Sequence, residues 1–88
     1  MMEREAQIVN SLGLHARPAA QIVRLASTFA SDIQIAKDGT AVNAKSIMGV
    51  MLLVAECGSS VVITAKGADA EEAVAALAAL VARGFGES

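Results

Sequence analysis

The sequence predicts an α/β protein of the α+β kind, in which a small antiparallel sheet carries its helices on one face. Three observations support this prediction. A helical stripe of apolar residues runs from Ala16 to Ala30, an Asp38-Gly39 pair marks a tight hairpin, and a capped helical pattern closes the chain. The predicted order is strand, helix, strand, strand, helix, strand, helix (βαββαβα), which a two-layer domain accommodates.

The first part of the chain alternates weakly and then becomes helical. Residues 3–10 are predicted to form a short strand with Ala6 and Ile8 on one face, and residues 11–17 to form a loop. A helix is predicted from Ala16 to Ala30, because apolar residues recur at helical spacing and polar residues occupy the opposite side. The apolar stripe of this helix consists of Ala19, Ile22, Val23, Ala26, Phe29 and Ala30.

The central segment is typical of a hairpin followed by a short helix. Residues 32–37 alternate in polarity, and residues 40–43 return as the partner strand. Asp38-Gly39 favours the turn between them, because a primed turn requires positive φ angles. The apolar face of the first strand carries Ile33 and Ile35. A short helix is predicted from Ser46 to about Ala55.

The end of the chain predicts one more strand and one more helix. The strand has an apolar face made of Val61, Ile63 and Ala65. Asp69 is followed three residues later by Glu72, which is a capping signature, so the Asp69 side chain is expected to cap the last helix. The buried stripe of that helix consists of Ala73, Leu77, Leu80 and Val81, and Gly84 ends it. On the pattern alone, a ferredoxin-like plait is equally allowed.

The composition excludes several classes of protein. The 88 residues suffice for one domain, so residues 1–88 are predicted to form a single unit whose chemistry lies at the surface. A net charge of −2 without a basic run argues against nucleic acid as a partner. The longest apolar run, Ile47 to Ala55, is far shorter than the about twenty residues of a membrane span. With no secretory signal and one cysteine, Cys57, we expect a reduced cytoplasmic protein with no membrane partner.

The single histidine, His15, precedes the first amphipathic helix. Proline is tolerated in the first turn of a helix, so Pro18 predicts that His15 lies at or just before the N-cap. The backbone N–H groups of Ala16, Arg17 and Ala19 are then expected to point back toward the imidazole. Free donors and the positive end of the helix dipole favour an anion there, and the Arg17 guanidinium matches phosphate oxygens. The sequence therefore predicts a phosphate-binding position at His15.

A neutral imidazole is a nucleophile, and the helix end disfavours its protonated form. Gly13 allows a tight turn just before the histidine. Phosphoryl transfer needs positioning and charge stabilisation more than covalent machinery, so the arrangement favours a shuttle over a stand-alone enzyme. The alternative is a histidine that merely caps the helix or lies on the surface. No cofactor is expected, and no metal site, because there is no second histidine and Cys57 is distant in sequence.

Two stretches resemble the histidine phosphocarrier (HPr) family of the phosphoenolpyruvate-dependent phosphotransferase system. Residues 13–19 (GLHARPA) resemble the active-site signature, and residues 45–51 (KSIMGVM) resemble the regulatory-serine region. The resemblance covers essentially the whole chain and implies an open-faced β-sandwich with four antiparallel strands and three helices. It also implies that enzyme I phosphorylates His15 on Nδ1, that the phosphoryl group passes to an enzyme IIA domain, and that Arg17 stabilises it.

Ser46 precedes an apolar helix, which predicts an N-cap. The resemblance implies that Ser46 is also the target of a serine kinase/phosphorylase, with a transcriptional regulator as a further partner. The short helix has more apolar residues than one face requires, so some must be exposed. Ile47, Met48 and Met51 are therefore either a docking surface for partners or part of the core. Lys45 is expected to be a solvated charge.

Other functions stay open at this point. The Ala-rich last helix and the end at residues 83–87 resemble the regulatory, nitrogen-type branch of the family more than the sugar-transport branch, and we assign no role to Phe85 or Glu87. The candidates are phosphoryl carriage in sugar uptake, a signalling module that acts by docking, and a binding domain without phosphate chemistry. The pair His15 and Arg17 favours the first two.

Overall fold

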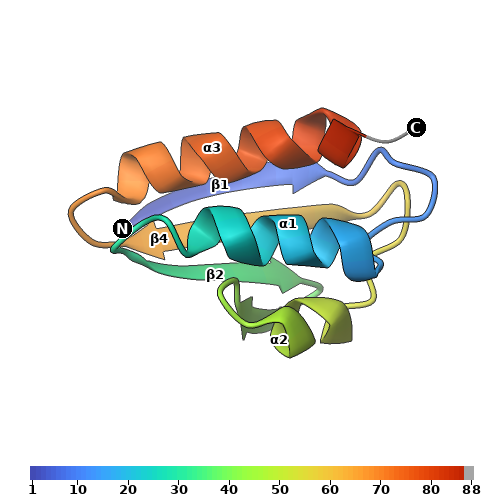
Figure 1. Ribbon diagram of the computed structural model, residues 1–88, viewed down its shortest axis with the longest axis horizontal. Helices are drawn as coiled ribbons and strands as arrows, with labels where there is room; N and C mark the ends of the chain where they lie inside the picture. The colour runs from blue at the N-terminus through green and yellow to red at the C-terminus, as the bar shows by residue number, and fades with distance from the viewer. Residues whose placement is uncertain (87–88) are drawn as a thin grey trace.

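The computed structural model describes residues 1–86, and its elements follow the predicted order (Figure 1). The elements are, in chain order, β1 (Met2–Gln7), α1 (Ala16–Ala26), β2 (Asp32–Lys37), β3 (Thr40–Asn43), α2 (Ile47–Leu52), β4 (Ser60–Lys66) and α3 (Ala70–Ala82), with a 3-10 turn η1 (Gly84–Gly86) after α3. No helix within residues 1–86 is both long and apolar enough to span a membrane.

The four strands form one antiparallel sheet in the order β1-β4-β2-β3. The last strand, β4, therefore lies in the interior of the sheet, where Ile63 is opposite Arg4 on β1 and Ile35 on β2. The helices lie on one face, with α1 and α3 side by side and α2 near the β3 edge (Figure 1). The predicted open-faced β-sandwich is confirmed. The strand order, which the periodicity left open, distinguishes it from the plait.

The core lies between the sheet and the helices. Alternation places Ile33 and Ile35 of β2 on the helix-facing side, and both are buried. The predicted apolar face of β4 and the predicted stripe of α3 are likewise buried: Val61, Ile63, Ala65, Ala73, Leu77, Leu80 and Val81. On α1, Ala19, Ile22 and Ala26 are buried. These buried faces could be predicted from the sequence, because each element buries its apolar side chains in the one layer between the sheet and the helices.

Three predicted boundaries are wrong. β1 ends at Gln7 instead of residue 10, although Ile8 is fully buried and its N–H donates to the carbonyl of Ser59 at 2.8 Å. α1 ends at Ala26 instead of Ala30, and α2 ends at Leu52 instead of about Ala55. After α1 the chain continues in tight turns, in which the Phe29 N–H donates to the Ala26 carbonyl, and Ala30 is exposed.

The predicted role of Asp69 is also wrong. Asp69 is the N-cap residue of α3, but its side chain makes no cap hydrogen bond. Its carboxylate instead accepts the Ala30 N–H at 2.8 Å, the Ser31 N–H at 2.9 Å and the Ser31 hydroxyl. These donors outcompete the helix amides because three converge on one carboxylate, so Asp69 ties the end of α1 to the start of α3.

Candidate functional site

The structure places His15 at the N-cap of α1, as expected from Pro18. Its backbone is extended (φ −83°, ψ −171°), and its carbonyl accepts the Ala19 N–H at 3.0 Å, the first bond of the helix. The imidazole makes no cap hydrogen bond to the helix. The half-buried side chain is therefore left beside the helix end instead of folding back over it.

Two backbone donors remain at this helix end. The prediction that the Ala19 N–H is free is wrong, because it is bonded to His15. Pro18 has no N–H and is buried. Ala16 and Arg17 are the first two residues of the helix, so their N–H groups have no intrahelical acceptor. Both residues are exposed, which leaves these two amides and the Arg17 side chain open to an anion.

The turn before His15 is pressed against the segment that follows α2. Gly13 has φ +67°, and a Cβ atom at this position would lie 2.4 Å from the carbonyl oxygen of Ala55. The next residue, Leu14, donates its N–H to that same oxygen at 2.8 Å. Glycine is required at residue 13 for its conformation and for the close backbone approach. The prediction of a tight turn is confirmed.

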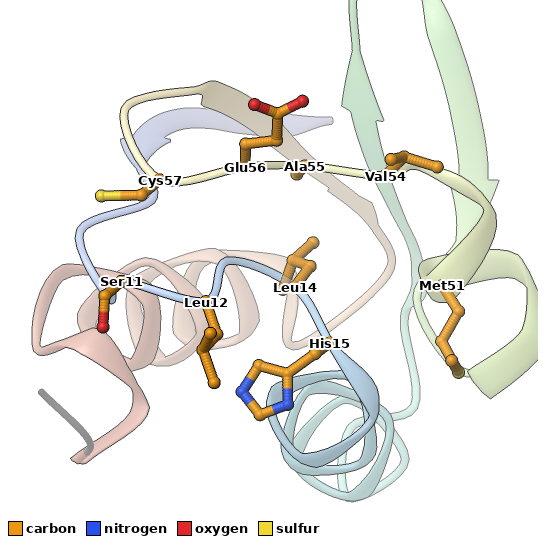
Figure 2. A pocket seen from close by; sticks show the side chains of 9 residues that line it. All are labelled: Ser11, Leu12, Leu14, His15, Met51, Val54, Ala55, Glu56 and Cys57. Carbon is orange, nitrogen blue, oxygen red and sulfur yellow. The ribbon is translucent and has the colours of Figure 1, made fainter.

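His15 lies at the wall of an open surface depression of about 500 Å³. Side chains from both sides line it, chiefly Leu12, Leu14 and His15 facing Met51, Val54 and Cys57. Figure 2 shows the imidazole beside Leu12 and Leu14, with the Glu56 carboxylate directed to the far side of the 54–57 segment. A wide, shallow space of this kind admits a group carried by another protein. Cys57 is exposed and is brought to this depression by the fold, with Sγ 3.8 Å from the Val9 carbonyl.

The apolar residues of α2 are largely exposed. Met48 and Leu52 are 74% and 73% exposed, and Ile47 and Met51 are 43% and 44% exposed, whereas Val50 is fully buried. The expectation that some must be exposed is confirmed. We call Ile47, Met48, Met51 and Leu52 the α2 patch. Because Met51 also lines the depression, the patch is continuous with the surroundings of His15.

Ser46 is the N-cap of α2, as expected: its hydroxyl accepts the Gly49 N–H at 3.2 Å. The interpretation of Lys45 as a solvated charge is wrong. Its Nζ donates to the Phe29 carbonyl at 2.8 Å and the residue is half-buried, because the end of α1 leaves carbonyl groups without helical partners close by. Lys45 therefore links α2 to the end of α1.

Sequence reasoning missed two residues near the site. Asn10 is 1% exposed and hydrogen-bonds within the turn before His15. A signal existed, since Asn10 continues the apolar alternation of Ala6 and Ile8. Val54 has φ +50°, an outlier for a β-branched residue, and no sequence signal marks it.

At the C-terminus, Phe85 is buried and its carbonyl accepts the side-chain N–H of Gln21 at 3.2 Å, while Glu87 lies outside the described residues. Over residues 1–86, His, Cys, Asp and Glu side chains form no group of three or more that could hold a metal ion.

Comparison with known proteins agrees with this geometry. The family model described as PTS HPr component phosphorylation site matches residues 2–83. The phosphocarrier protein HPr of Cupriavidus necator is 48% identical over 87 residues, covering 99% of this chain and 98% of that protein. The crystal structure of HPr-C-His from Thermoanaerobacter tengcongensis superposes with a TM-score of 0.95 at 50% identity, covering 100% of this chain and 99% of that chain. The phosphocarrier protein HPr of Bacillus anthracis gives a TM-score of 0.87 at 52% identity, covering 91% and 95%. The chain belongs to the HPr family of phosphocarrier proteins of the phosphotransferase system.

Proposed function

We propose that this chain accepts a phosphoryl group on His15 from phosphorylated enzyme I and passes it to enzyme IIA domains in sugar uptake. The observation that carries the proposal is the position of His15 at the N-cap of α1, beside the depression and next to the amides of Ala16 and Arg17. Family membership supports phosphotransfer as the reaction class. The whole chain, residues 1–88, acts as one carrier domain in the cytoplasm.

In the proposed step, the lone pair of the His15 Nδ1 forms a bond to phosphorus as the bond between phosphorus and the donor atom of enzyme I breaks. One bond to phosphorus is exchanged for another, and the donor atom keeps the electron pair of the broken bond. The phosphoryl oxygens gain the backbone N–H groups of Ala16 and Arg17 and the Arg17 guanidinium as donors. No water is needed, since the group moves directly between two proteins. Reversal with an enzyme IIA acceptor uses the same contacts.

The α2 patch serves as the docking surface in this proposal. Ile47, Met48 and Met51 are exposed, and Met51 also lines the depression beside His15. Flexible methionine side chains adapt to more than one partner. A carrier must bind its donor and its acceptor with the same face, because both must reach the same imidazole. An apolar, adaptable surface beside His15 suits that requirement.

Ser46 provides a regulatory position beside this patch. A phosphate at the start of α2 would be favoured by the helix end but would add negative charge at the rim of the docking surface. We propose that a serine kinase/phosphorylase acts here and that the modified protein binds a transcriptional regulator. The exposed patch also suits the alternative, a nitrogen-type regulatory module that acts by docking, in which phosphorylation of His15 changes the affinity for a target.

The experiment is incubation with phosphoenolpyruvate and enzyme I, followed by intact mass measurement. We expect one added phosphate that is labile in acid and stable in base, as a phosphoramidate is. His15→Ala should gain none and should retain its fold, because the His15 side chain makes no cap bond. Phosphate on the His15→Ala protein would refute the proposal. Onward transfer to a sugar-specific IIA domain, compared with a nitrogen-type IIA domain, separates the two functions.

A further inference from the structure

The turn that precedes His15 is built on a buried polar side chain. Asn10 is 1% exposed, and within residues 1–86 Ser31 is the other buried polar residue. Burying an amide costs free energy unless it is hydrogen-bonded. Asn10 lies two residues beyond Ile8, and both residues are buried. The nitrogen of this amide has a specific partner in the turn, the Gly13 carbonyl.

Asn10 closes the turn through its side chain and its backbone. Its Nδ2 donates to the Gly13 carbonyl at 2.8 Å, and the Gly13 N–H donates to the Asn10 carbonyl at 3.1 Å. The same Gly13 carbonyl also accepts the His15 N–H at 3.0 Å. The Gly13 carbonyl oxygen thus links the Asn10 amide to the backbone of His15. The direction of this carbonyl fixes the plane of the peptide between Gly13 and Leu14, just before α1.

The surroundings leave this turn little room to adjust. On one side, Gly13 touches the Ala55 carbonyl and Leu14 donates to it at 2.8 Å. On the other, Asn10 lies beside Gly84, the first residue of η1, where an added Cβ on the glycine would be 3.7 Å from the Asn10 Cβ. The turn is thus packed between the segment after α2 and the end of the chain after α3, and the Asn10 side chain supplies the hydrogen bond within it.

We propose that Asn10 is a positioning residue for the reaction of His15, an inference that rests on the proposed function. Its amide holds the Gly13 carbonyl toward the His15 N–H and so orients the imidazole relative to the amides of Ala16 and Arg17. Without the amide, the Gly13 carbonyl loses one of its two donors. The imidazole then spends less time in line with a phosphoryl group that those amides can stabilise.

The test compares variants at the two buried polar residues. Asn10→Ala acts at the N-terminal end of α1, and Ser31→Ala acts beyond its C-terminal end, against Asp69. Both remove a buried hydrogen-bonding group, so both are expected to lower thermal stability. Asn10→Ala alone should lower the rate of phosphoryl transfer at saturating donor by at least about tenfold, with an unchanged KM for the donor protein. An equal loss of transfer rate in both variants would show that Asn10 only stabilises the fold, and would overturn its positioning role.

A second variant and a second measurement keep the test decisive. Asn10→Leu preserves the shape of the side chain without its amide and should show the same loss of rate. NMR of the unphosphorylated protein gives the HN–Hα coupling of His15, which reports its φ angle, and we expect this coupling to change in both Asn10 variants but not in Ser31→Ala. An unchanged coupling, or a wild-type transfer rate in Asn10→Leu, would overturn the proposal. If wild-type protein accepts no phosphate, the proposed function fails, while the coupling still tests whether Asn10 fixes the backbone conformation of His15.

Discussion

The Asp69 carboxylate accepts two hydrogen bonds from Ser31, one from its backbone N–H at 2.9 Å and one from its hydroxyl. Together with the Ala30 N–H at 2.8 Å, these bonds join segments 38 and 39 positions apart in the sequence. They lower the pKa of Asp69 below its ordinary value of 3.8, and the Ser31 hydroxyl is the largest cause. The ionised carboxylate is thus part of the tertiary structure at the end of the domain away from His15.

This depressed pKa predicts an acid-sensitive stability. A carboxyl group with a lowered pKa in the folded state stabilises the protein fully above the pKa of the unfolded chain, and the contribution is lost as the pH falls through the folded value. We therefore expect the Tm of the wild type to decline as the pH falls below 3.8, and the Tm of Asp69→Asn to decline less. Asp38→Asn, at an exposed hairpin residue, is the control. Parallel melting profiles for wild type and Asp69→Asn would contradict the prediction.

Arg17→Ala should slow phosphoryl transfer without abolishing it. Removing one charge-stabilising donor typically costs about a hundredfold or more in rate, while the amides of Ala16 and residue 17 stay in place. Rapid-quench measurement of transfer from enzyme I and to a IIA domain tests both directions. Arg24→Ala removes an exposed arginine on the same helix, two turns away, and is the matched control. Equal rates for Arg17→Ala and wild type would exclude a phosphate-binding role.

Ser46→Asp should keep or slightly raise thermal stability and slow the phosphorylation of His15 by enzyme I. Aspartate is an N-cap residue and its charge is favoured at the helix start, whereas a rim charge opposes docking of an acidic partner. Melting curves and initial rates at varied enzyme I concentration measure the two effects separately. Ser46→Ala, which lacks both the cap and the charge, should lose about 0.5–2 kcal/mol and dock normally. An unchanged rate in Ser46→Asp with intact stability would remove the regulatory interpretation.

Val54→Gly should stabilise the protein. The left-handed conformation of Val54 costs about 1–2 kcal/mol for a side chain with Cβ, and the extra entropy of glycine in the unfolded chain offsets about half of that. The side chain is 65% exposed, and the bond from Lys37 Nζ to the Val54 carbonyl, at 3.1 Å, does not require it. Chemical denaturation measures the difference. Val9→Gly, at a half-exposed valine without positive φ, should destabilise, and a loss of stability in both variants would contradict the strain argument.

Local patterns in the sequence were sufficient to predict several buried faces and the start of α1. The alternation of Ile33 and Ile35, and the helical spacing of Leu77 and Val81, identified buried faces because burial of one apolar face is what shapes each element. Pro18 located the start of α1 and hence His15, since its ring is compatible with the first turn and not with the interior. These signals act within one or two turns of the chain, so they can be found in the sequence.

The sequence by itself determined the order of the elements, their buried faces and the placement of His15 at the start of α1. The tertiary structure decided the strand order, the end of α1, and the partners of Asp69, Lys45 and Asn10. The reason is that a charged or amide side chain can form hydrogen bonds of similar strength with several different backbone groups. The packing of distant segments then determines which of these groups comes within hydrogen-bond distance. The Asp69 carboxylate bonds to Ala30 and Ser31 instead of capping its own helix, because the fold brings three donors from these two residues to it.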